Sequence, residues 1–124
     1  MILLPLLLLG PLALVPLPLV PDTQGGERFA CHMNALTKAD RARHQELTKS
    51  LLAAVNEQKE LPDGYGFRLP TESLTTAAEW ISLERLCCPF FTFELEQARD
   101  GGPLWLQVKG PEGVKSFIKM EFGL

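Results

Sequence analysis

Three short stretches of the chain carry side chains that could do chemistry: Cys31-His32, Glu84-Arg85 and the vicinal pair Cys87-Cys88. Thiolates, imidazoles and carboxylates are the ligands that zinc takes in proteins, and three thiolates alone suit a thiophilic ion or trivalent arsenic. We therefore predict a site for zinc or another thiophilic metal or metalloid, formed by Cys31, Cys87 and Cys88 with His32 or Glu84 as a further ligand.

The location of Cys87 and Cys88 disfavours a redox enzyme. The two thiols close a predicted helix, so they lie at the negative end of its dipole, and Glu84 stands one turn back. Both effects raise the pKa of a thiol, whereas oxidoreductase cysteines gain acidity at the opposite end of a helix. A cysteine nucleophile would also need a base, and neither His32 nor His44 has an evident carboxylate to orient it. A cysteine-based enzyme is therefore the least favoured interpretation.

Packing is the alternative role for the cysteines. Free cysteine is among the most buried residue types. Cys88 falls on the same helical stripe as Ile81, and Cys87 lies beside Trp80. If the chain is exported, a disulfide from Cys31 to either Cys87 or Cys88 is expected, which leaves one unpaired thiol.

The hydrophobic pattern after residue 26 predicts an α+β domain in which an N-terminal helix is followed by β-α-β-β-α. Apolar residues recur at helical spacing in three segments and alternate in three others. We expect helices over 38–59 and 71–88, strands over 65–69, 90–95 and 104–109, and a final helix from residue 111. A right-handed crossover then gives a three-stranded antiparallel sheet with the helices on one face, like a truncated ferredoxin-like fold.

The sheet face away from the helices is a second candidate site. Alternation places Phe90, Thr92, Trp105 and Gln107 on that face. An uncovered pair of aromatic side chains, Phe90 and Trp105, could bind a ligand, a protein partner or a second copy of the chain. The alternative function is therefore a protein-interaction or dimerisation domain whose cysteines are structural.

Residues 1–26 form a leader and linker outside the predicted domain of residues 27–124. Residues 2–20 are leucine, proline and other apolar types, a length that suits a signal or membrane tether and predicts export or tethering. Four prolines interrupt any helix there, and neither Lys nor Arg precedes the apolar run. A mis-assigned start is the alternative, and it would leave the protein cytoplasmic.

Composition excludes several classes of protein. The 124 residues hold 12 Lys and Arg against 15 Asp and Glu, a net charge of −3. This balance lacks the excess of positive charge that binding to a phosphate backbone requires, so we expect no nucleic-acid partner. Collagen, coiled coils and polytopic membrane proteins are also excluded.

One stretch of the chain resembles the E-R-x-C-C-P-F-x-x-F signature of a family of small bacterial proteins. It reads Glu84-Arg85-Leu86-Cys87-Cys88-Pro89-Phe90, with Phe93 after it. A second stretch also resembles this family and reads Gly64-Tyr65-Gly66-Phe67-Arg68-Leu69-Pro70. The resemblance covers roughly residues 28–122. It implies a bacterial origin and no particular activity, because the family has none established.

Overall fold

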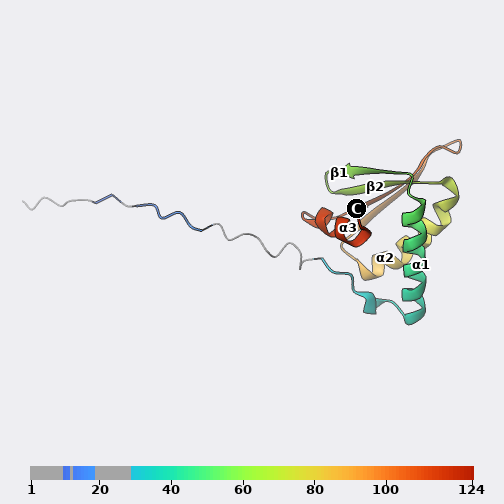
Figure 1. Ribbon diagram of the computed structural model, residues 1–124, viewed down its shortest axis with the longest axis horizontal. Coiled ribbons are helices and arrows are strands. Elements are labelled where there is room, and N and C mark those ends of the chain that lie inside the picture. Colours follow the sequence, from blue (N-terminus) through green and yellow to red (C-terminus); the bar gives the residue numbers. More distant parts are fainter. Residues whose placement is uncertain (1–9, 12, 19–28) are drawn as a thin grey trace, which may run out of the picture.

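The computed structural model of the chain describes residues 10–11, 13–18 and 29–124 (Figure 1). Residues 10–11 and 13–18 form neither helix nor strand. Most of the leader lies outside the described residues, so export and tethering stay predictions. Within the described part, no helix is long and apolar enough to cross a membrane.

The α-helices and strands are, in chain order, α1 (Lys38–Ala54), β1 (Glu57–Leu61), β2 (Gly64–Leu69), α2 (Leu74–Cys87), β3 (Thr92–Gln97), β4 (Leu104–Lys109) and α3 (Val114–Phe122).

The fold is α+β, as predicted, but its antiparallel sheet has four strands in the order β1-β2-β4-β3. The prediction of three strands was wrong because residues 57–59 were assigned to the end of the first helix. That helix ends at Ala54, and Val55 already has extended backbone angles. Pro62 and Asp63 then form the turn of a β1–β2 hairpin in which Leu61 pairs with Gly64.

The β1 segment reads Glu-Gln-Lys-Glu-Leu, and its first four residues are exposed. Charged side chains on an edge strand oppose pairing with another chain, and they hide the alternation that marks a half-buried strand. The remaining topology follows the prediction. Strands β2 and β3 flank β4 and both run antiparallel to it, so they are parallel to each other across the α2 connection.

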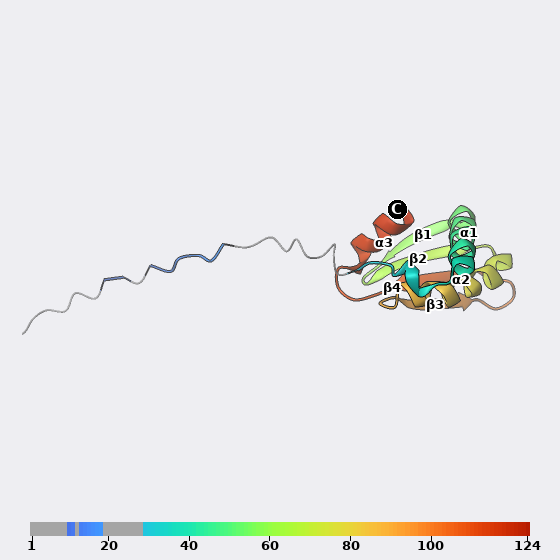
Figure 2. The same cartoon turned by 90° about the horizontal axis from the view of Figure 1, so that it is seen from below.

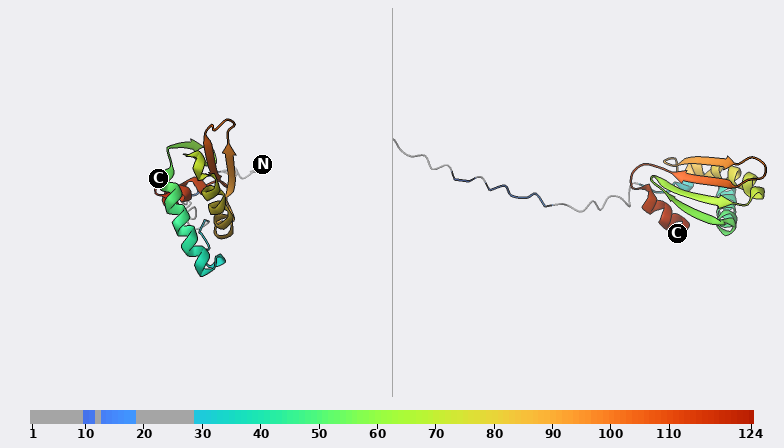
Figure 3. Two further views of the ribbon diagram at one scale, coloured as in Figure 1. Left: turned by 90° about the vertical axis from the view of Figure 1, so that its right-hand side faces the viewer. Right: turned by 90° about the horizontal axis from the view of Figure 1, so that it is seen from above.

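All three helices pack on one face of the sheet, and Figures 2 and 3 give further views of the arrangement. The inward face of β2 and β4 is apolar and buried, with Phe67 and Leu106 as neighbours in the register. The Phe122 ring of α3 lies 6.1 Å from Phe67, and the Trp80 ring of α2 lies 5.6 Å from Phe93. Burial of these rings helps to hold α2 and α3 on the sheet.

The segment before α1 crosses the C-terminal end of α2. Its Phe29 is buried, with its ring centroid 5.0 Å from that of Phe90. The backbone N–H of His32 donates to the carbonyl oxygen of Cys87 at 2.7 Å. Thr37 then caps α1 by accepting a hydrogen bond from the Asp40 N–H at 3.1 Å. Two distant parts of the sequence therefore meet at the end of α2.

Gly64 offers a test of the sheet register. A β-carbon at this position would lie 2.0 Å from the backbone oxygen of Val108 and 2.8 Å from the Cα of Lys109. Because backbone cannot move aside locally, we expect Gly64→Ala to lower the free energy of unfolding by about 1–3 kcal/mol, measured by urea denaturation.

Gly66→Ala in the same strand is the matched control. Its new methyl group would meet only the flexible side chain of Lys59, so the loss should be much smaller. Equal losses for the two variants would contradict the close approach of β2 and β4 at Gly64.

Candidate metal centre

The last turn of α2 carries three of the predicted ligands into the protein interior. Glu84 and Cys87 are three residues apart and share a helix face, and Cys88 follows at the cap, where its N–H donates to the Glu84 carbonyl oxygen. The exposed fraction is 1% for Glu84 and 0% for both cysteines. Pro89 follows the cap and cannot continue the helix. Both cysteines therefore have the burial that the alternative, packing role requires.

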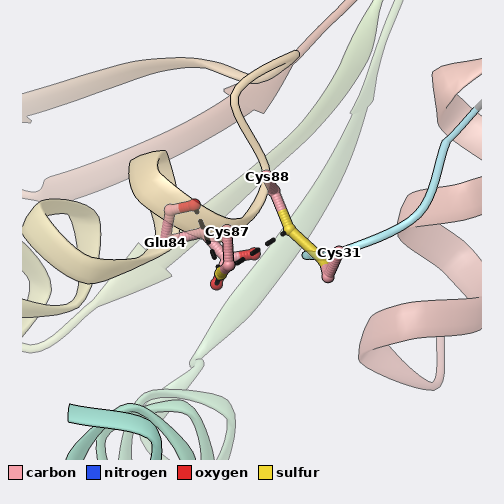
Figure 4. A group of neighbouring side chains, drawn as sticks. All are labelled: Cys31, Glu84, Cys87 and Cys88. Atoms are coloured by element: carbon pink, nitrogen blue, oxygen red, sulfur yellow. Dashed lines mark hydrogen bonds between the residues drawn. A yellow bond between two sulfur atoms is a disulfide. The ribbon is translucent and has the colours of Figure 1, made fainter. Parts of the chain in front are cut away.

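Cys31 comes from the segment before α1 and forms a disulfide with Cys88, 57 positions later, with 4.9 Å between the two Cα atoms. Cys87 is left as a free, buried thiol. Sequence reasoning had left the partner of Cys31 open between the two neighbouring cysteines. Figure 4 shows why Cys88 is the partner: its side chain points toward Cys31, whereas the side chain of Cys87 lies beside Glu84.

The four predicted donors Cys31, Glu84, Cys87 and Cys88 converge on one point (Figure 4). One ligand atom from each of these residues lies within 4.8 Å of the other three. The Cys87 sulfur is 3.9 Å from the Cys88 sulfur and 3.8 Å from Oε2 of Glu84. His32, the other predicted ligand, is exposed and does not belong to this group; its backbone N–H donates to the Cys87 carbonyl oxygen.

His44 is the residue that sequence reasoning missed. Helix α1 presents it to the interior, where its Nε2 pairs with Oε2 of Glu84 and lies 4.0 Å from the Cys87 sulfur. The expectation that no carboxylate orients a histidine was therefore wrong. His44 stands one turn before Leu47 on the buried stripe of α1, and a titratable residue on a buried stripe requires a polar partner.

Hydrogen bonds between α1 and α2 fix the position of His44. The indole N–H of Trp80 donates to the hydroxyl oxygen of Thr48 at 2.9 Å, and that hydroxyl donates to the His44 carbonyl oxygen at 2.8 Å. At the surface, the Arg43 guanidinium makes a bidentate contact with the Glu79 carboxylate at 2.8 Å. Nδ1 of His44 is buried without a partner among the described residues.

The electrostatic environment keeps Cys87 protonated. Burial, and secondly the charge of Glu84, raise the pKa of the Cys87 thiol to about 11. The prediction of a raised thiol pKa at this helix end is confirmed. A thiol that is both protonated and without solvent exposure cannot attack a dissolved substrate.

The outer sheet face differs from its prediction. Trp105 lies there, half-buried, with the ammonium of Lys59 4.1 Å from its ring centroid. Phe90 lies in the loop before β3 instead, with its ring 5.3 Å from Phe117 of α3. The position of Phe90 was wrong because the strand begins only at Thr92. The two aromatic residues therefore do not form a common surface.

Comparison of the chain with protein-family models, with curated proteins and with solved structures finds no match.

The raised pKa of Cys87 predicts slow alkylation. The ordinary value of 9.0 rises to about 11, so the thiolate fraction near pH 7.5 falls about 100-fold. We expect iodoacetamide to modify native, non-reduced protein at least 100-fold more slowly than the same protein unfolded in urea, measured by intact mass. Equal rates would contradict the burial of this thiol.

Glu84→Gln tests the second cause of that shift. Removing the carboxylate charge lowers the pKa of Cys87, so the native alkylation rate should rise and its pH profile should move to lower pH. Burial remains, and the variant should still react more slowly than the unfolded chain. An unchanged pH profile would show that Glu84 does not act on Cys87.

Proposed function

We propose that the reduced protein binds one soft metal ion or metalloid through Cys31, Cys87 and Cys88, with Glu84 as the fourth donor to a tetrahedral ion. The observation that carries the proposal is the convergence of these four donors, from two distant parts of the chain, within 4.8 Å of one another. A group of three sulfurs and one carboxylate matches the ligand preference of zinc, and the sulfurs alone match trivalent arsenic.

The spacing of the donors supports a tetrahedral ion. Ligands about 2.3 Å from a tetrahedral zinc lie about 3.8 Å from one another. The Cys87 sulfur lies 3.9 Å from the Cys88 sulfur and 3.8 Å from the Glu84 oxygen. Small side-chain rotations would bring these donors to an ion once the disulfide is open.

The charges of the site also favour a cation. Glu84 is almost fully buried, and the C-terminal end of α2, with its partial negative charge, lies beside it. A bound cation would offset the negative charge of the Glu84 carboxylate and of the helix end. It would also take the place of the thiol protons, so the effective pKa of the coordinating thiols would fall. His44 contacts Glu84 through Nε2 and is thereby placed to orient the carboxylate toward an ion, as residues behind metal ligands commonly do.

Native mass spectrometry of the full chain tests the proposal. The protein is reduced, freed of metal with a chelator and mixed with zinc or with arsenite. We expect one ion per chain for the wild type, and loss of binding in Cys87→Ser and Cys88→Ser. His32→Ala is the matched control, because it changes an exposed neighbour outside the donor group, and it should bind as the wild type does. Binding that survives both cysteine substitutions would contradict the site.

Glu84→Gln separates the two kinds of ion. A fourth donor is required for tetrahedral zinc, whereas trivalent arsenic needs only three thiolates. We expect the zinc affinity to fall at least about tenfold and the arsenite affinity to change little, each measured by competition with a chelator or a dithiol. Zinc affinity equal to that of the wild type would remove Glu84 from the donor set.

A further inference from the structure

We propose that the Cys31–Cys88 disulfide and the bound ion are alternative cross-links of the same junction, so that oxidation releases the ion and reduction restores binding. This inference rests on the proposed function and adds its regulation. The disulfide joins two of the four converging donors, and a sulfur in a disulfide cannot be a thiolate ligand.

The closed disulfide leaves a poor site. Cys87 remains as the one thiol, 3.8 Å from Oε2 of Glu84. The disulfide removes the sulfurs of Cys31 and Cys88 from the three sulfur donors, and a single thiol does not select a thiophilic ion.

Noncovalent contacts hold Cys31 in place when the disulfide is open. The His32 N–H donates to the Cys87 carbonyl oxygen at 2.7 Å, next to the site. Phe29 is buried against Phe90 on one side of Cys31, and Leu36 is 3% exposed on the other. Reduction therefore yields three thiols that are already gathered, rather than a free segment that must find the site.

Exposure decides which sulfur an oxidant meets first. Cys31 is partly exposed, whereas Cys87 and Cys88 have no exposed surface. With a small-molecule disulfide as oxidant, the Cys31 thiolate attacks one of its sulfurs, a mixed disulfide forms and one small thiolate leaves. The Cys88 thiolate then attacks the Cys31 sulfur, forms the protein disulfide and expels the second small thiolate. Two protein thiolates lose two electrons in total, the small-molecule disulfide gains them, and the ion loses two ligands.

Titration of the zinc-loaded full chain with oxidised glutathione tests this inference. Zinc release is followed with a colorimetric chelator, and disulfide formation is followed by peptide mass mapping of samples quenched with acid. We expect one zinc released for each Cys31–Cys88 disulfide formed, and renewed binding of one zinc after reduction. Circular dichroism of the reduced, zinc-free chain checks that release does not reflect unfolding.

Cys87→Ser is the matched variant, because it keeps the disulfide pair and removes the third sulfur. We expect it to form the Cys31–Cys88 disulfide with glutathione at least as readily as the metal-free wild type, while it binds zinc weakly. Saturating zinc should slow disulfide formation in the wild type and leave the rate in the variant nearly unchanged.

Two results would overturn the inference in different ways. Zinc that stays bound after the Cys31–Cys88 disulfide has formed would contradict the exchange of cross-links and leave the proposed metal site standing. A folded, reduced chain that never takes up zinc or arsenite would contradict the metal site itself, and the regulation with it.

Discussion

The carboxylate of Glu84, buried in the core at the end of α2, is the constraint that organises this end of the molecule. A buried charge is costly unless a partner or a cation compensates it. His44 supplies one partner by pairing its Nε2 with Oε2 of Glu84, and this contact requires α1 to lie against α2. Cys87 shares the helix face of Glu84 and lies 3.8 Å from the same oxygen. The buried carboxylate of Glu84 therefore both joins α1 to α2 through His44 and lies beside the Cys87 thiol.

A cross-link at the same place joins the segment before α1 to the end of α2. The disulfide spans 57 positions, and in the chain-entropy account a loop of that size stabilises the folded state by about 4 kcal/mol. Small domains have a total stability of about 5–15 kcal/mol, so the junction matters to the whole fold. An ion held by Cys31, Cys87 and Cys88 would restrain the same two segments. In the proposed exchange the same two segments stay joined by one cross-link or the other, so the fold around the site would not have to change.

Much of the architecture could be predicted from the sequence because periodicity is strong in the segments that face the core, such as the alternation of Leu104, Leu106 and Val108. Strand β1 could not be predicted, because a charged edge strand buries almost nothing and carries no alternation. The convergence of Cys31 with Cys87 and Cys88 was expected from their chemistry alone. The choice of Cys88 as disulfide partner and the contact between His44 and Glu84 depend on how α1 crosses α2, and no local pattern encodes that crossing.

The zinc K-edge absorption spectrum of the reduced full chain, loaded with one equivalent of zinc and desalted, tests the central claim most directly. The account predicts three sulfur ligands at about 2.3 Å and one oxygen ligand, since the donor group holds three cysteines and Glu84. Zinc bound through nitrogen and oxygen alone, or a desalted chain that retains no zinc, would contradict it.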